Sequence, residues 1–483
     1  MAGRMAIVTI AVIVIVWHPA HGFSQERFRK TPPPPDPLAE INLPDIQTAP
    51  LSNGLSVSVI RQNTLPLLSI KLIIMTGESS SPSHLPGLAT FASRMVNKGT
   101  STRSSAEIEE AIESIGGEFS VSLYPDYTLI SFTFLEEFLD EALDLLGDMI
   151  LRPTYPNVEI DNVKRTMRYD LIGKYSDPEF LAIRLLQMIL FENHPYRRIW
   201  YVEEVIKNYG RKDLIDFVGR FYRPNNAGLI LTGNLNLSTA TRKVSHYLGT
   251  WTRTEMTAAE SDPPKPPDKK RICFFDLPQA KDVTIYIGTV ITLPADKNIF
   301  PYLVMNQVLG GTPNSRLFMN LRESKGYAYW AFSELEFLKN CGVFSVKIKA
   351  RPEVTFASVE ESLNEIKKIT SERISAFEIE QAKSFLIGNF ALGLETYDDL
   401  SSKLSEILAF GLKEEHWNGY YENIMIINAE KVFEVARIAP LLTPVVVIIG
   451  DVRRLTEPLA ELGEVEVYDH SGRFLYSWKG EKP

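Results

Sequence analysis

Arg322 and Tyr329 are residues whose types and spacing suit peptide chemistry. A guanidinium offers forked donors to a substrate carbonyl, and a phenol can donate to the oxyanion that forms when water attacks a peptide bond. Neither group activates water, so the pair alone cleaves nothing. Both residue types are also common on surfaces, and an isolated pair at this spacing is usually a solvated helix end and a tyrosine packed in a sheet.

The segment that carries the pair predicts a helix followed by a strand. Leu317, Phe318 and Leu321 form one apolar helix face. Lys325 and Gly326 end the helix, and a strand follows directly. The arginine would then lie near the end of the helix and the tyrosine near the start of the strand.

The histidines give little support for a metal site. Those beyond the first thirty residues are His84, His194, His246, His416 and His470. No two stand three or four residues apart, the spacing that places both on one helix face. His84 is expected in a turn, and His194 precedes a proline and is expected to be structural. The run Glu414-Glu415-His416 is interpreted as a charged helix surface rather than a set of ligands.

Composition places the chain among ordinary folded proteins. Its 483 residues suit two large domains or several small ones. A net charge of −9 argues against a duplex nucleic-acid binder, which needs a basic face. The only cysteines, Cys273 and Cys341, stand in strand-like segments, which favours two buried thiols, although one disulfide is an open alternative.

The N-terminus predicts export. Arg4 precedes an apolar run from Ala6 to Trp17, and residues 20–22 offer a small-x-small cleavage site. The run is shorter than the roughly 20 residues that span a bilayer, so a cleaved signal peptide over residues 1–22 is favoured over a membrane anchor. A proline-rich tether follows at residues 23–47.

Two halves of similar pattern follow the tether. A run of prolines and charges predicts a linker at 258–271 between domains at 48–257 and 272–483. Three short segments of the first half recur in the same order and at nearly constant spacing in the second. Their pairs are 117–121 with 342–346, 159–164 with 378–383, and 229–234 with 446–451. Such recurrence indicates an internal duplication.

Local patterns assign the elements of each half. Leu55 to Ile60, Ile70 to Met75 and Thr128 to Leu135 predict strands. A capping box at 104–107 opens a helix, and 137–151 is helical by period. The predicted class is α+β, with two duplicated halves that each pack helices on a mostly antiparallel sheet.

Residues 87–100, Gly-Leu-Ala-Thr-Phe-Ala-Ser-Arg-Met-Val-Asn-Lys-Gly-Thr, resemble the insulinase/pitrilysin metallopeptidases, including the mitochondrial-processing-peptidase branch. The resemblance covers roughly residues 48–455 and implies the LuxS/processing-peptidase-like metallohydrolase fold. Active members carry His-x-x-Glu-His in this helix, whose histidines bind zinc while the glutamate deprotonates the metal-bound water. Here Thr90, Ser93 and Arg94 stand at those positions, and the family's third ligand falls on Asp170. The resemblance therefore implies that this chain has no zinc site.

The same resemblance gives Arg322 and Tyr329 their role, because family members use an arginine and a tyrosine at this spacing opposite the zinc. In similar bacterial pairs, one subunit holds zinc and a sister subunit supplies the arginine–tyrosine pair. The expected partner is thus a zinc-bearing homologous subunit, the substrate a peptide, and the location periplasmic or secreted. The alternatives are an inactive peptide-binding or structural scaffold of the same fold, and a self-sufficient peptidase that uses another metal.

Overall fold

The computed structural model describes residues 44–256, 261–293, 299–412, 415–455, 459–469 and 472–479. The expected signal peptide, nearly all of the tether, residues 258–260 of the linker, Glu414 and His470 lie outside this range. In the described part of the chain, no helix has the length and apolar character needed to cross a bilayer.

The first half of the chain forms a six-stranded sheet in the order β1-β2-β6-β3-β5-β4, in which only β2 and β6 run parallel. Its strands are β1 (Ile46–Pro50), β2 (Ser56–Arg61), β3 (Leu67–Ile74), β4 (Glu118–Leu123), β5 (Thr128–Leu135) and β6 (Ala227–Gly233). Its helices are α1 (Leu88–Arg94), α2 (Ser105–Ser114), α3 (Leu139–Leu151), α4 (Asn157–Lys174), α5 (Pro178–Leu190), α6 (Glu203–Ile206), α7 (Arg211–Phe221) and α8 (Leu237–Leu248).

The second half forms a seven-stranded sheet in the order β13-β12-β7-β11-β8-β10-β9. Its strands are β7 (Arg271–Asp276), β8 (Val283–Ile291), β9 (Ala328–Phe337), β10 (Gly342–Ala350), β11 (Val445–Gly450), β12 (Val465–Tyr468) and β13 (Phe474–Trp478). Its helices are α9 (Phe300–Gly310), α10 (Thr355–Ser371), α11 (Ala376–Leu392), α12 (Tyr397–Phe410), α13 (Glu415–Asn418), α14 (Tyr420–Met425) and α15 (Ala429–Ile438), together with a π-helical segment, Phe318–Ser324.

The duplicated α+β architecture predicted from the sequence is confirmed. The order β2-β6-β3-β5-β4 in one sheet matches β7-β11-β8-β10-β9 in the other. The parallel pair β2–β6 recurs as β7–β11, and the second sheet adds another parallel pair, β7–β12. The repeated segments at 159 and 378 lie on α4 and α11, and those at 229 and 446 lie on β6 and β11. The third match is wrong: residue 117 precedes the edge strand β4, whereas residue 342 opens β10, the equivalent of β5. The two segments share a strand pattern but not a position.

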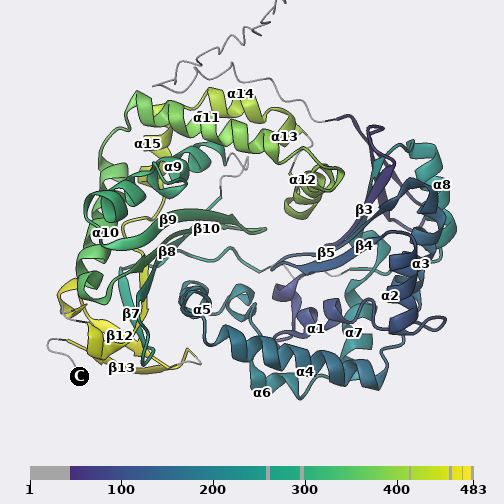
Figure 1. The fold of residues 1–483 in the computed structure, drawn as a ribbon, viewed down its shortest axis with the longest axis horizontal. Coiled ribbons are helices and arrows are strands. Elements are labelled where there is room, and N and C mark those ends of the chain that lie inside the picture. The colour runs from purple at the N-terminus through teal and green to yellow at the C-terminus, as the bar shows by residue number, and fades with distance from the viewer. Residues whose placement is uncertain are drawn as a thin grey trace, which may run out of the picture. The chain divides into compact units, whose positions relative to one another are not determined.

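Each half lends one helix to the sheet of the other half (Figure 1). Helix α12 packs on β3 and β6, where Leu408 lies close to Gly228 and the hydroxyls of Ser401 and Thr232 are 2.7 Å apart. Helix α5 packs in the same way on β8 and β11, with Leu186 close to Gly288. A glycine in each sheet makes room for a leucine of the exchanged helix. The domain boundaries at 257 and 272 stay a prediction, but helix packing crosses them.

Several local predictions are confirmed to the residue or nearly so. Ser104 caps α2 and Glu107 completes the capping box. The predicted strand from Thr128 to Leu135 is β5. The helix predicted from Glu137 begins as a 3-10 turn and becomes α-helical at Leu139. The two cysteines are buried, free thiols.

Candidate functional site

Helix α1 carries the residues that stand where the resemblance places two histidines and a glutamate. It begins after Gly87, whose φ of 91° favours glycine. The carboxylate of Glu78 caps its first turn: Oε1 accepts from the Gly87 N–H at 2.6 Å, and Oε2 accepts from the Thr90 N–H at 2.9 Å. The Thr90 hydroxyl also donates to Glu78 Oε2, at 2.8 Å. Thr90 is thus engaged in the cap of its own helix.

Arg94 and Asp170 form an ion pair between α1 and α4, with Nη1 and Oδ2 2.7 Å apart. The sequence comparison placed these residues at the positions of the second and third metal ligands, and the structure brings them into contact. Ser93 directly precedes Arg94 on α1, and its hydroxyl donates to the Thr90 carbonyl at 2.9 Å. Thr90, Ser93, Arg94 and Asp170 are called the degenerate zinc positions below. Their side chains form hydrogen bonds or an ion pair within this set or with Glu78.

These residues do not fit a zinc ion. Arg94 brings a positive charge to the place of the cation, and it uses the one carboxylate of the set as its partner. Lys174 adds a second positive group nearby: burial lowers its pKa, and the charge of Arg94 lowers it further. Zinc sites need three or four nitrogen, sulfur or oxygen ligands around the ion. Among the described residues, no group of three or more histidine, cysteine or acidic side chains could hold a metal.

We expect the purified chain to retain less than one tenth of an equivalent of zinc after dialysis against micromolar zinc and then buffer, because the ligand positions hold a hydroxyl and an ion-paired guanidinium. Elemental analysis by mass spectrometry measures the ratio. A zinc-bearing family member treated in the same way is the positive control. One bound zinc per chain would contradict the assignment.

Glu78 is a residue of this site that the sequence analysis missed. It is 3% exposed, and its role depends on a loop that folds back over the start of α1, which no local spacing reveals. Burial raises its pKa to about 7, although hydrogen bonds from Ser81, Thr90 and Gly87 oppose the shift. The folded protein therefore binds a proton at Glu78 more tightly than the unfolded chain does.

This shift predicts a pH dependence of folding. In the unfolded chain a glutamate titrates near pH 4.3, so the contribution of Glu78 to stability is fully present below that pH and is lost as the pH rises toward 7. Relative to Glu78→Gln, the natural protein should lose about 3 kcal/mol of unfolding free energy between pH 4 and pH 8. Urea unfolding at several pH values measures this difference. Parallel pH profiles of the two proteins would show that Glu78 does not titrate in this range.

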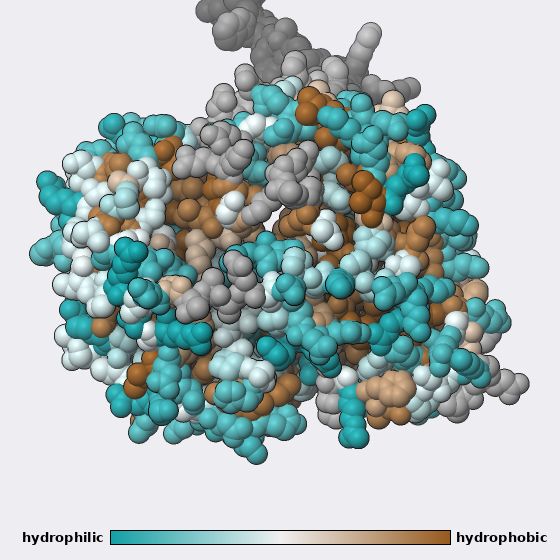
Figure 2. Space-filling view, turned by 180° about the vertical axis from the view of Figure 1, so that it is seen from behind, coloured by the Kyte–Doolittle hydropathy of each residue, from teal (hydrophilic) through white to brown (hydrophobic). Residues whose placement is uncertain are grey.

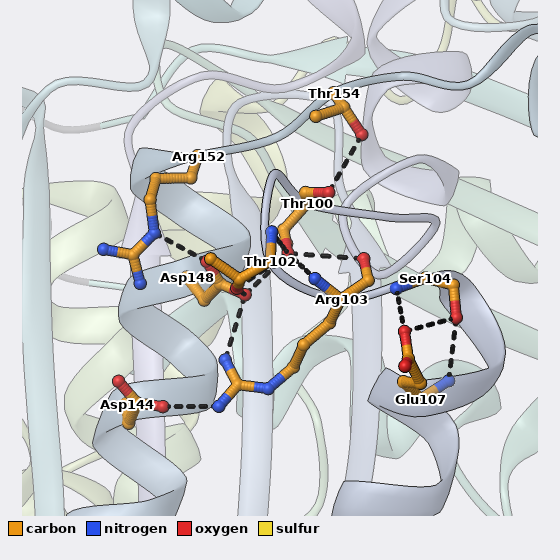
Figure 3. Close-up of polar contacts among 9 residues, drawn as sticks. All are labelled: Thr100, Thr102, Arg103, Ser104, Glu107, Asp144, Asp148, Arg152 and Thr154. Atoms are coloured by element: carbon orange, nitrogen blue, oxygen red, sulfur yellow. Dashed lines mark hydrogen bonds and ion pairs between the residues drawn. The ribbon is translucent and has the colours of Figure 1, made fainter.

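A buried aspartate fixes the loop that follows α1 (Figure 3). Asp148, on α3, is 1% exposed and accepts hydrogen bonds from the hydroxyls of Thr100 and Thr102, both at 2.6 Å. Arg103 and Arg152 also donate to it, at 3.0 and 2.7 Å. Burial opposes the charge of Asp148, but these four donors outweigh it and lower its pKa to about 2. The chain that leaves α1 is therefore tied to α3.

Arg322 and Tyr329 lie on adjoining elements of the second half. Arg322 is on the π-helical segment, where its guanidinium stacks 4.9 Å from the ring of Phe318 and its Nε lies 3.6 Å from Glu323. Tyr329 is on the edge strand β9 and is 51% exposed. The negative charge of Asp282, with a hydrogen bond to it, raises the pKa of Tyr329. The phenol thus stays protonated, and its proton is donated to the Asp282 carboxylate.

Arg322 and Tyr329 are both about half exposed to solvent. Neither makes a hydrogen bond or ion pair with Thr90, Ser93, Arg94 or Asp170 in the part of the chain that the structure describes. The pair and the degenerate zinc positions are thus two separate groups of side chains.

The histidines are placed largely as expected. His84 is in an exposed turn. The ring of His194 accepts a hydrogen bond from the Tyr196 N–H at 3.2 Å, which confirms a structural role. His416 differs from the expectation of a charged surface: its ring stacks on Phe300, with centroids 5.1 Å apart. The His416 ring is therefore partly buried against Phe300, the first residue of α9.

Comparisons with known proteins agree with this architecture. A family model described as "Insulinase (Peptidase family M16)" matches residues 57–201, and one described as "Peptidase M16 inactive domain" matches 208–386. The chain is 25% identical to the "Uncharacterized zinc protease YmxG" of Bacillus subtilis, over 80% of this chain and 93% of that protein. It is 26% identical to the "Non-peptidase homolog YmxG" of Helicobacter pylori, over 73% and 81%.

Solved structures show the same fold. The peptidase M16 inactive domain from Pseudomonas fluorescens matches with a TM-score of 0.79 at 21% identity, over 84% of this chain and 98% of that chain. A protease from Helicobacter pylori matches with a TM-score of 0.78 at 18% identity, over 84% and 100%. Together with the two domain models, which cover more than half of the sequence, these likenesses show that the chain belongs to the insulinase family, peptidase family M16.

Proposed function

We propose that this protein is the non-zinc subunit of an insulinase-like peptidase. Arg322 would donate hydrogen bonds to a substrate carbonyl, and Tyr329 would donate to the oxyanion that forms during hydrolysis. A zinc-bearing homologous subunit would supply the metal centre that this chain lacks. The protein by itself would then be a pseudoenzyme that binds peptides without cleaving them.

The observation that carries this proposal is the contrast between the two groups of residues. The positions that would bind metal are closed by an ion pair and a helix cap. Arg322 and Tyr329, by comparison, keep half of their side-chain surface open to solvent, and the pKa of Tyr329 is raised rather than lowered. Retention of this guanidinium and phenol at the spacing that the family uses favours a substrate-binding role over a scaffold without a peptide ligand.

Reconstitution tests the proposal. The chain is mixed with a family member from the same organism that carries the His-x-x-Glu-His motif, and hydrolysis of a quenched fluorescent peptide library is followed. We expect little hydrolysis by either protein alone and at least tenfold more by the mixture. Full activity of the zinc protein alone would contradict the proposal. Peptide binding by this chain without any gain in hydrolysis would instead support the scaffold alternative.

The proposed location is the periplasm, reached through the signal peptide expected at residues 1–22. Fractionation of cells that express the full chain, with N-terminal sequencing of the product, tests both points. A product that starts at Phe23 in the periplasmic fraction is the expected result. Retention of the initial apolar run in a membrane fraction would contradict it.

A further inference from the structure

A cavity of about 350 Å³ lies where elements of both halves meet. The turn between β4 and β5, the turn between β9 and β10, and the end of α12 contribute its walls. Small-molecule sites typically have volumes of about 300–1,000 Å³, so the cavity can hold a small ligand. Figure 2 shows hydrophobic residues gathered around a hollow near the middle of one face of the molecule.

Aromatic side chains form much of this cavity. Tyr124 and Tyr127 stack with their centroids 4.4 Å apart, and Phe410 meets Tyr127 edge to face at 6.1 Å. Trp417, which is 8% exposed, forms another part of the wall. Aromatic faces carry negative electrostatic potential and attract organic cations as well as apolar groups.

Three carboxylates also line the cavity: Asp126, Glu336 and Glu406. Two of them have partners. Glu406 is paired with Lys403 at 3.1 Å. Asp126 accepts from the Tyr196 hydroxyl at 2.8 Å and from the Lys339 N–H at 2.9 Å. The third, Glu336, makes no side-chain hydrogen bond or ion pair with any residue that the structure describes.

Glu336 has charges of both signs around it, and Lys339 is a cationic residue that also lines the cavity. Burial raises the pKa of Glu336, and the negative charges of Glu334 and Asp126 add to this effect, whereas Lys347 opposes it. The ammonium of Lys347 is, however, bonded to Glu334. A partly buried carboxylate without a partner is unfavourable, so a cation beside Glu336 would stabilise the site.

We infer that the cavity binds an organic cation, whose aliphatic or aromatic part fills the aromatic walls while its ammonium group contacts Glu336. An uncharged ligand would dehydrate the carboxylate without compensating it, and an anion would be repelled. This inference does not depend on the proposed peptidase role, because none of the lining residues belongs to the degenerate zinc positions or to the Arg322–Tyr329 pair.

Three ligands of matched size test the charge requirement on the natural full-length chain. Calorimetric titrations compare phenethylammonium, the neutral 2-phenylethanol and the anionic 3-phenylpropionate. We expect phenethylammonium to bind at least tenfold more tightly than either of the others. Equal binding of the neutral or anionic compound, or no binding of the cation, would overturn the inference.

Two variants locate the site. Glu336→Gln should weaken binding of phenethylammonium about tenfold, because it removes the charge and keeps the shape. Glu118→Gln is the matched control: it is an exposed glutamate at the start of β4 and does not line the cavity, so this variant's affinity should stay within about twofold of the natural protein. Equal effects of the two substitutions would place the bound cation elsewhere.

Discussion

Arg322→Ala should lower peptide hydrolysis by the reconstituted pair by a factor of about 10² to 10³, the usual effect of removing one donor to a developing oxyanion or its carbonyl. Tyr329→Phe should act in the same direction, because it deletes only the hydroxyl. Arg322 is held by stacking on Phe318 and by a long contact to Glu323, so its loss leaves no buried partner without a charge. The folded state should therefore be little affected.

Steady-state rates separate this effect from loss of assembly. The turnover number should fall while the chain still binds the zinc-bearing subunit in analytical ultracentrifugation. Arg373→Ala is the matched control for the arginine, since it also removes an exposed, singly paired guanidinium. Tyr476→Phe serves for the tyrosine, because it is similarly exposed on β13. Unchanged hydrolysis by both site variants would refute the role proposed for the pair.

Asp148→Ala should reduce the free energy of unfolding by about 3–5 kcal/mol, because it leaves two guanidinium groups and two hydroxyls without their shared acceptor. Chemical denaturation monitored by circular dichroism measures the change. Asp144→Ala is the control on the same helix: the Asp144 side chain is 41% exposed and pairs with Arg103, so its loss should cost less than about 1 kcal/mol. Similar losses of unfolding free energy in the two variants would show that the buried network around Asp148 stabilises the fold no more than an exposed ion pair does.

The pH dependence of this effect has the opposite sign to that of Glu78. The pKa of Asp148 is lowered to about 2 in the folded protein, whereas a free aspartate titrates near 3.9. The stabilisation by Asp148 is thus present above pH 4 and is lost as the pH falls toward 2. The difference between the natural protein and Asp148→Ala should shrink over that interval.

The elements that could be predicted from sequence are those whose signals are local. The capping box at Ser104 and the alternating pattern of β5 depend on residues within one turn or one strand, and both predictions are confirmed. Two of the three repeats behind the predicted duplication lie on equivalent elements. The match of 117 with 342 does not, because a five-residue strand pattern is too common to align one half with the other. The absence of a His-x-x-Glu-His motif at 90–94 was also evident from the sequence alone.

The remaining features depend on contacts between segments far apart in the chain. Glu78 caps α1 from across a loop, and Asp148 gathers donors from a segment more than forty residues earlier. Counting positions along the sequence selected Asp170, but it could not show that Asp170 pairs with Arg94. Nor could any local pattern show that Glu336 lies beside the aromatic cavity, because the walls come from both halves.

The exchange of α5 and α12 has a consequence for how such a chain can be divided. A polypeptide ending in the linker would keep α5, which its own sheet does not use, and would lack α12, which covers β3 and β6. Two copies of such a fragment could supply the missing helix to each other. The covalent chain thus has the connectivity of a fused, helix-swapped homodimer. The sequences of its two halves can diverge, but each half still needs a helix from the other to cover its sheet.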